Sequence, residues 1–437
     1  MLTRLLYSAA WYLAMPLVLA RLWWRGRKEP GYRRFVGERL GMYKSTGSGN
    51  WPVIWVHAVS VGETRAAQPL VEALLSAYPR HTVLLTHMTP TGRATGNLLF
   101  SEHASRFVQA YLPYDTGYLA GRFIRHFAPR LCILMETEVW PNLIAQCAAR
   151  GVPVALVNAR LSERSLAKAR RFSALIAPAA RAISCVAAQT EADARRLRDF
   201  GAGNVQVTGS IKFDVTPPDS ALAKGDALRA RIGARPVLLC STTRDGEEAL
   251  ILDAFDALDV TDVLLVIVPR HPQRFEAVTE LVVARGWKPC LRSSLGKNMT
   301  DGSLSPEVKI FIGDSMGEMF SYYQACDLAF IGGSLLPLGG HNLIEACAIG
   351  KPVLIGEHTF NFGTITEEAV AAGAALRVAD AQALMQQASR LLQDVERCHA
   401  MGKKAQAFAM QHRGATERTM VLLAPLLAYS DSHQKQQ

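Results

Sequence analysis

Short apolar runs rich in Val, Ile and Leu alternate with helix-length segments along most of the chain. In the first half, the candidate strands cover residues 53–59, 82–87, 107–113, 131–135, 152–158, 182–188 and 205–209. These runs are almost continuously apolar, which is typical of strands that are buried on both faces of a parallel sheet. Their separation by helical segments predicts repeated βα units.

The alternation pauses at VTPPDS, residues 215–220, which is the clearest linker signal. It resumes with candidate strands at 236–242, 262–269, 308–313, 328–333 and 352–356, and the polar stretch 292–307 is expected to be a surface loop. We therefore predict an α/β protein with two doubly wound, Rossmann-like domains. The predicted division is 31–215, a linker at 216–220, 221–415, and a C-terminal helix over 416–437 for which packing on the first domain is one option.

Residues 1–30 are expected to form a membrane anchor with a basic flank. An uncharged run between Arg4 and Arg21 continues through Trp23 and Trp24, so residues 5–24 are long enough to span a bilayer or to lie in its interface. The following RGRKEPGYRR would face the cytoplasm and attract anionic lipid. The alternative is an ordinary apolar helix docked on the protein, with a solvated basic tail.

Composition narrows the class further. The 437 residues are 49% hydrophobic and 20% charged, which excludes a disordered, collagen-like or coiled-coil chain. The net charge of +10 is uneven, because residues 1–50 hold nine Lys and Arg against two Glu. A nucleic-acid binder spreads its basic residues over a whole domain, so we expect no nucleic-acid partner. The eight cysteines include no C-x-x-C pair, which indicates free thiols in a reducing compartment.

Ligands of doubly wound sheets bind beyond the carboxyl ends of the strands, so the residues just after each strand are the first candidates. HAVSVGET (57–64) follows the first strand and offers Glu63 as a general base, or as an ordinary first-turn acid of the next helix. The same segment nearly matches the G-x-S-x-G nucleophile elbow, which would make Ser60 the nucleophile of a hydrolase.

Further polar residues follow later strands of the first half. Glu136 and Glu138 follow the fourth strand, where one of them can stabilise positive charge on a sugar; alternatively, both cap the next helix. Arg160 follows the fifth strand. Lys212 follows the seventh strand, where it can pair with a phosphate or carboxylate of a ligand. The alternative is a solvated residue at the sheet edge.

The second half carries glycine-rich segments at its strand ends. PRHPQRF (269–275) clusters basic residues, and GDSMGEM (313–319) places Gly317 and Glu318 at a helix start that can bind an anion. GGSLLPLGGHNLIEA (332–346) combines glycine turns with a helix opened by His341 and Asn342, which suits a nucleotide. The sequence has no P-loop, no G-x-G-x-x-G, no H-E-x-x-H and no Asp-x-Asp pair, so it predicts no cofactor and no metal site.

Two Rossmann-like domains, a nucleotide-type site in the second and carboxylates in the first resemble a GT-B glycosyltransferase, in which the two domains face a cleft. The ordered motifs extend this likeness: GERLG (37–41), HAVSVGET, HMTPTG (87–92), LPYD (112–115), METEVWPN (135–142), NARLS (158–162), GSIKFD (209–214), PRHPQRF, GDSMGEM, GGS…GGHN..E (332–345) and HTFNF (358–362). In this order they closely resemble the 3-deoxy-D-manno-octulosonic acid (Kdo) transferases of lipopolysaccharide synthesis.

The resemblance implies an inverting, metal-independent transfer of Kdo from CMP-Kdo to a lipid A precursor, at the cytoplasmic face of the inner membrane. It implies CMP or donor contacts at Arg270, His271, Met316, Gly317, Glu318, Asn342, Leu343, Ile344 and Glu345. Glu136 and Lys212 would stabilise the transition state.

Two glutamates match the family's candidates for the base, and both stay open. Glu63 follows a strand end, whereas Glu38 precedes the first strand, near the membrane segment through which a lipid acceptor enters. Three other functions are kept as alternatives: another GT-B glycosyltransferase with a different nucleotide-sugar donor, a serine hydrolase built on Ser60, and a non-enzymatic membrane-surface scaffold.

Overall fold

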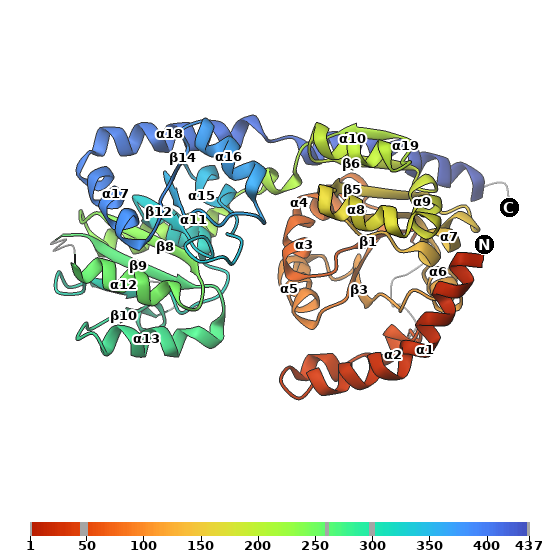
Figure 1. The fold of residues 1–437 in the computed structure, drawn as a ribbon, viewed down its shortest axis with the longest axis horizontal. Coiled ribbons are helices and arrows are strands. Elements are labelled where there is room, and N and C mark those ends of the chain that lie inside the picture. Colours follow the sequence, from red (N-terminus) through yellow and green to blue (C-terminus); the bar gives the residue numbers. More distant parts are fainter. Residues whose placement is uncertain (1, 44–50, 258–261, 297–301, 435–437) are drawn as a thin grey trace. The chain divides into compact units, whose positions relative to one another are not determined.

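The computed structural model describes residues 2–43, 51–257, 262–296 and 302–434 (Figure 1). The chain forms two compact units. Unit 1 comprises residues 1–214 together with 413–437, and unit 2 comprises 215–412. Each unit is an α/β domain built on a parallel sheet, as the apolar runs predict.

The sheet of unit 1 has the order β3-β2-β1-β4-β5-β6-β7, and every pairing is parallel. Its strands are β1 (Val53–His57), β2 (Thr82–His87), β3 (Phe107–Tyr111), β4 (Pro129–Met135), β5 (Val154–Ala159), β6 (Cys185–Ala188) and β7 (Val205–Val207). The order reverses beside β1, so the carboxyl ends of β1 and β4 lie at the topological switch point, where such sheets bind ligands.

The sheet of unit 2 has the order β10-β11-β9-β8-β12-β13-β14, again with parallel pairings. Its strands are β8 (Val237–Thr243), β9 (Leu264–Pro269), β10 (Cys290–Leu291), β11 (Ile310–Ile312), β12 (Leu328–Ile331), β13 (Val353–Ile355) and β14 (Ala375–Arg377). The two edge strands, β10 and β14, were not predicted, because runs of two and three residues are too short to carry a pattern.

Helices connect the strands and cover both faces of each sheet (Figure 1). In unit 1 they are α1 (Leu2–Arg25), α2 (Val36–Arg39), α3 (Val61–Ala66), α4 (Gln68–Ala77), α5 (Pro90–Phe100), α6 (Gly117–Phe127), α7 (Pro141–Ala148), α8 (Glu163–Arg171), α9 (Ser173–Arg181), α10 (Glu191–Asp199) and α19 (Ala415–Gln434). In unit 2 they are α11 (Asp219–Ile232), α12 (Glu247–Ala257), α13 (Phe275–Val283), α14 (Met319–Ala325), α15 (Ile344–Ala348), α16 (Gly363–Ala371), α17 (Ala381–Gln393) and α18 (Val395–Gln411).

The core of unit 1 explains why its strands read as continuous apolar runs. On one face of the sheet, Trp55 of β1 packs against Phe123 of α6. On the other face, Val56 belongs to a cluster with Leu70 of α4 and Leu423 of α19. Successive residues of a strand point to opposite faces, so both must be apolar when both faces are covered.

The C-terminal helix α19 belongs to unit 1. Asp214 accepts hydrogen bonds from the backbone N–H groups of Gly414 (2.7 Å) and Thr416, and Arg418 Nε donates to Thr208 O at 2.9 Å. The predicted linker 216–220 is shorter in the structure, because α11 begins at Asp219, directly after the extended Pro218. Arg292 lies in a stretch predicted as a surface loop, yet its side chain is buried.

Helix α1 has two different faces. Residues 7, 8, 11, 14, 15, 18, 19 and 22 form its less exposed stripe, and this stripe contacts unit 1. Asn142 Nδ2 donates to Ser8 Oγ at 3.0 Å, and the ring of Trp11 stacks on that of Tyr114 at 5.5 Å. The opposite stripe is exposed and apolar, comprising Leu2, Leu5, Leu6, Leu13, Leu17 and Trp24. Among the described helices, α1 has the length and hydropathy of a membrane span.

The basic N-terminal segment is partly folded into the protein. The Arg33 guanidinium lies over the ring of Trp23 at 4.1 Å, and that of Arg25 lies over Tyr32 at 4.4 Å. Arg39 is buried, with its guanidinium over Tyr111 and its Nη2 donating to Met88 O. Lys44 lies outside the described residues. Some cationic side chains of this segment are therefore engaged in contacts within the protein, and the others remain on its surface.

Candidate active site

Three strand ends of unit 1 meet at Glu136, directly after β4. Lys212 Nζ lies 2.8 Å from Glu136 Oε1, and Arg160 Nε lies 3.4 Å from Glu136 Oε2. Arg160 follows β5, and Lys212 stands in a 3₁₀ turn (Ile211–Asp214) after β7. The Glu136 side chain is 11% exposed, Lys212 19% and Arg160 47%. The structure thus brings together three residues that the strand-end rule selected separately.

The backbone at this cluster is strained in two places. Glu136 and Asn158 have φ of 57° and 53°, in the left-handed region that non-glycine residues rarely adopt. Asn158 Oδ1 accepts from Ile211 N at 3.2 Å, which ties β5 to the turn that carries Lys212. The extended backbone of β4 therefore ends before Glu136, and the left-handed conformation of this residue directs its carboxylate to the two cations. Strain of this kind concentrates at functional sites.

Glu63 lies in the first turn of α3, after β1. Its Oε2 accepts from Val59 N at 2.8 Å, and its Oε1 accepts from Ser60 Oγ at 3.3 Å. Burial raises the pKa of Glu63 to about 7, and the nearby charges of Glu138 and Glu136 act in the same direction. Within the described residues, Glu63 forms no ion pair, in contrast to Glu136. A carboxyl group with these properties can take up and release a proton near neutral pH.

Glu38, the other candidate base, has both carboxylate oxygens engaged. Arg93 Nη1 lies 2.6 Å from Glu38 Oε2, and the N–H of Tyr111 donates to the same oxygen at 2.8 Å. Arg93 Nη2 reaches Oε1 at 3.4 Å. The carboxylate joins α2 to α5 and to the end of β3, which is a structural role. The geometry therefore favours Glu63 as the base.

The alternative of a hydrolase built on Ser60 finds no support in the local geometry. Ser60 Oγ donates to Glu63 rather than to a histidine. The nearest histidine on β2, His87, instead contacts Ala58 O through Nδ1 at 3.2 Å, and burial lowers its pKa to about 4. A histidine with so low a pKa is a weak general base at neutral pH.

In unit 2, one buried carboxylate holds the glycine-rich loop that follows β12. Glu247, in the first turn of α12, accepts from the backbone N–H groups of Gly333 (2.6 Å), Ser334 (3.0 Å) and Leu335 (3.0 Å), and also from Arg244 N (2.9 Å). Its side chain is fully buried. Gly333 has φ of 72°, which its missing side chain allows. The sequence does not reveal this contact with the loop, since Gly333, Ser334 and Leu335 lie more than 80 residues from Glu247 in the chain.

Basic residues gather at the ends of β8 and β9. Arg270 and His271 are exposed directly after β9. His341 Nδ1 lies 2.9 Å from Thr242 O, and burial, followed by the charge of Arg270, lowers its pKa to about 4. The pKa of His271 is also lowered, by burial and by the charges of Arg244 and Arg270. Arg244 and Arg270 therefore lie near both histidines, and their positive charges suit an anionic ligand.

The GDSMGEM segment presents backbone rather than a free carboxylate. Met316 is 61% exposed and Gly317 has φ of 80°. Burial would raise the pKa of Glu318, but hydrogen bonds from Ser315 and Arg292 outweigh it and lower that pKa. Arg292 Nη2 donates to Glu318 Oε1 at 2.9 Å. The structure thus gives Glu318 a buried cationic partner that the sequence did not reveal.

The helix after the second glycine pair begins at Ile344, two residues later than predicted, and Asn342 Oδ1 accepts from Ile344 N at 3.1 Å in the turn before it. Leu343 and Ile344 have buried side chains, so only their backbone can meet a ligand. Glu345 is half-buried in the first turn. With five residues, α15 has a smaller dipole than the predicted helix. Among the described residues, no group of three or more His, Cys, Asp and Glu has the arrangement of a metal site.

Comparison with known proteins decides the family. Residues 34–215 match the sequence profile described as 3-deoxy-D-manno-octulosonic-acid transferase (kdotransferase), and residues 250–408 match that of glycosyl transferases group 1. The chain is 43% identical to the 3-deoxy-D-manno-octulosonic acid transferase of Bordetella pertussis over 95% of this chain and 97% of that protein. The chain belongs to the Kdo transferase family.

A second relative agrees with this assignment, and a solved structure shares the fold. The Kdo transferase of Haemophilus influenzae is 36% identical over 97% of this chain and 99% of its own length. The crystal structure of a glycosyltransferase from Rickettsia africae superposes with a TM-score of 0.58 at 14% identity, covering 86% of this chain and 99% of that one. The latter likeness shows the GT-B fold alone. The chain is therefore a glycosyltransferase that transfers Kdo, and the scaffold and hydrolase alternatives are set aside.

We predict that Glu247→Gln loosens the loop of unit 2, since an amide offers one acceptor oxygen where the carboxylate has two. Losing one charged hydrogen bond costs about 1.5–3 kcal/mol, which corresponds to an increase of at least about tenfold in amide exchange. Hydrogen exchange of residues 332–336 measures this. Glu276→Gln, at an exposed position on α13, is the control and should leave the loop unchanged. Unchanged exchange in Glu247→Gln would contradict the prediction.

Proposed function

We propose that the protein transfers Kdo from CMP-Kdo to a lipid A precursor with inversion and without a metal ion, at the cytoplasmic face of the inner membrane. The observation that carries the chemistry is the pair of differently held carboxylates in unit 1. Glu63 has a pKa raised to about 7, whereas Glu136 is paired with Lys212 and Arg160. Two carboxyl groups with such different surroundings suit two different roles.

Glu63 is the proposed general base. An acceptor hydroxyl attacks the anomeric carbon of Kdo, the new C–O bond forms opposite the bond to CMP, and CMP departs with that electron pair. The hydroxyl proton passes to Glu63 Oε. A base with a pKa near the working pH combines a useful ionised fraction with sufficient proton affinity. Ser60 and Val59 fix the carboxylate before substrate arrives.

The Glu136 cluster is the proposed transition-state stabiliser. Lys212, held by Glu136 at 2.8 Å, supplies positive charge to the anionic donor. The carboxylate of Glu136 offsets positive charge that develops on the sugar ring as the bond to CMP breaks. Fixed charges in a partly buried site are stabilising because they need no reorganisation during the reaction.

Unit 2 is the proposed CMP-binding unit. Arg270 and His271 belong to the basic residues described above at the ends of β8 and β9 and would contact phosphate. Residues 316–318 offer backbone around Gly317, and residues 342–345 offer the backbone of a turn with Glu345 for ribose hydroxyls. Glu247 supports this site indirectly, because it fixes the loop that precedes His341.

Helix α1 is the proposed membrane attachment. Contacts of Ser8 and Trp11 with unit 1 hold one stripe of the helix on the protein, while the opposite stripe is apolar and exposed. A spanning helix would be surrounded by lipid in its central turns. This two-faced packing instead supports a helix that lies in the interface, with the basic flank attracting anionic lipid.

The direct test is a transfer assay with radiolabelled CMP-Kdo and a tetraacylated lipid A precursor, run with and without excess EDTA. We expect a labelled lipid in both conditions, with an inverted anomeric configuration in the product. Transfer from another nucleotide sugar but not from CMP-Kdo would refute the donor. Loss of turnover in EDTA that added Mg²⁺ restores would refute the metal-free reaction.

We predict that Glu63→Gln lowers kcat by about 10²–10⁴-fold, because loss of a general base removes a contribution of that size. CMP binding, measured by calorimetry, should not change, since Glu63 lies in the other unit. Glu38→Gln serves as the comparison and should mainly lower thermal stability, as it breaks the ion pair with Arg93. A larger loss of kcat in Glu38→Gln than in Glu63→Gln would reverse the assignment.

The pH dependence of the reaction gives a second prediction. Glu63 must be ionised to accept a proton, so kcat should rise with pH and reach half its maximum near pH 7. Glu138→Gln removes one charge that raises this pKa, so the half-maximum should move to lower pH. A pH–rate profile measures both, with Glu102→Gln, an exposed acid, as the control. A shift to higher pH, or equal shifts in both variants, would contradict the prediction.

A further inference from the structure

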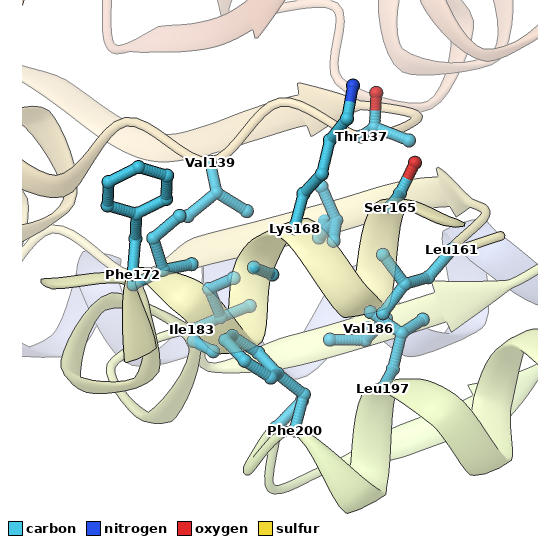
Figure 2. A pocket seen from close by; sticks show the side chains of 15 residues that line it. Thr137, Val139, Leu161, Ser165, Lys168, Phe172, Ile183, Val186, Leu197 and Phe200 are labelled. Atoms are coloured by element: carbon cyan, nitrogen blue, oxygen red, sulfur yellow. The ribbon is translucent and has the colours of Figure 1, made fainter. Parts of the chain in front are cut away.

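Unit 1 contains an apolar cavity of about 330 Å³ beneath α8 and α9. Its walls come from these two helices, from β5 and β6, and from α10. Figure 2 shows the floor formed by Ile183, Val186, Leu197 and Phe200. The volume is within the range of about 300–1,000 Å³ that is typical of small-molecule sites.

Two residues that line the cavity directly follow members of the Glu136 cluster in the chain. Thr137, which lines it, is the residue after Glu136, and Leu161, which also lines it, is the residue after Arg160. One part of the cavity wall is therefore adjacent in the chain to the ion pair that we assign to transition-state stabilisation.

Polar atoms lie on one side of the opening. Figure 2 shows the amine of Lys168 and the hydroxyls of Ser165 and Thr137 at the same edge, away from the apolar floor. Helix α8 also carries Arg164, Arg170 and Arg171, all exposed. Lys168 thus adds positive charge at the edge of an apolar interior, and the exposed arginines make the same helix basic, which complements a molecule with an anionic head and a hydrocarbon tail.

Helix α9 connects this cavity to the membrane helix. Ile176 and Ala180 of α9 line the cavity, whereas Ala174 O on the same helix accepts from Thr3 Oγ1 of α1 at 3.2 Å. Phe172, between α8 and α9, lines the cavity and is 64% exposed. The cavity is thus separated by one helix from the surface that we assign to the bilayer.

We propose that this cavity binds one acyl chain of the acceptor lipid. The inference rests on the proposed function and adds the subsite that recognises the tail. The chain lies on the floor formed by Leu197 and Phe200, and the phosphorylated sugar stays at the rim beside Lys168. A sugar or nucleotide would not suit the interior, because its hydroxyls would be buried without hydrogen-bond partners.

The test compares two acceptors in a filled cavity. Ala169→Phe, on the cavity side of α8, occupies the space, and Ala167→Phe, exposed on the same helix, is the matched control. With the tetraacylated lipid A precursor, Ala169→Phe should lower kcat/KM at least about tenfold, as changes of a few methylenes in apolar pockets do. With the fully deacylated phosphorylated disaccharide, neither variant should change kcat/KM by more than about twofold.

A loss in Ala169→Phe that is equal for both acceptors in a folded variant, or no loss with the acylated one, would overturn the proposal. A second measurement does not depend on any variant. A lipid A precursor with a diazirine at the end of an acyl chain should photolabel the wild-type protein at Thr137, at Val139 or between Leu156 and Ala202, the segments that line the cavity. Labelling confined to other segments would also overturn it. Failure of the proposed function is distinct, since wild-type protein would then transfer Kdo to neither acceptor.

Discussion

The arrangement of unit 1 depends on keeping Glu136 ionised in a site where its side chain is almost buried. A carboxylate removed from water needs cationic partners, and losing one partner of such a pair costs about 3–5 kcal/mol. Lys212 is the stronger partner, since it is closer and more buried, whereas Arg160 is half exposed and more screened by water. Because these cations come from different strand ends, their pairing fixes β4, β5 and the turn after β7 together.

The same pairing determines the character of Glu63. Glu136 takes both cations, so Glu63 is left with a backbone N–H, a hydroxyl and two neighbouring acids. Its charged form is therefore disfavoured, which is the property that a base needs. A substitution of Glu136 would for this reason change both the ion-pair cluster and the pKa of Glu63. A loss of activity in such a variant would not show which of the two changes caused it.

The sequence was sufficient for the interior strands, because continuous apolar runs locate strands, and it placed Glu63, Glu136, Arg160 and Lys212 after their carboxyl ends, where the structure also has them. It could not choose between Glu63 and Glu38, since that choice depends on Arg93 and Tyr111, which lie far from Glu38 in the chain. The role of Glu247 and the partner of Glu318 were missed for the same reason. The later start of α15 accompanies a local hydrogen bond from Ile344 N to Asn342 Oδ1, which no periodic pattern reveals.

The return of α19 to unit 1 has a consequence for the synthesis of the protein. Leu423 and Leu427 complete a core that the first 214 residues leave open. Asp214 likewise has no access to the N–H groups of Gly414 and Thr416 until residues 414–416 have been synthesised. On the ribosome, about 200 residues of unit 2 must emerge before the first unit can close. A truncated chain would carry an uncovered apolar sheet face, which chaperones and proteases recognise. Unit 1 therefore matures only in a chain that already contains unit 2.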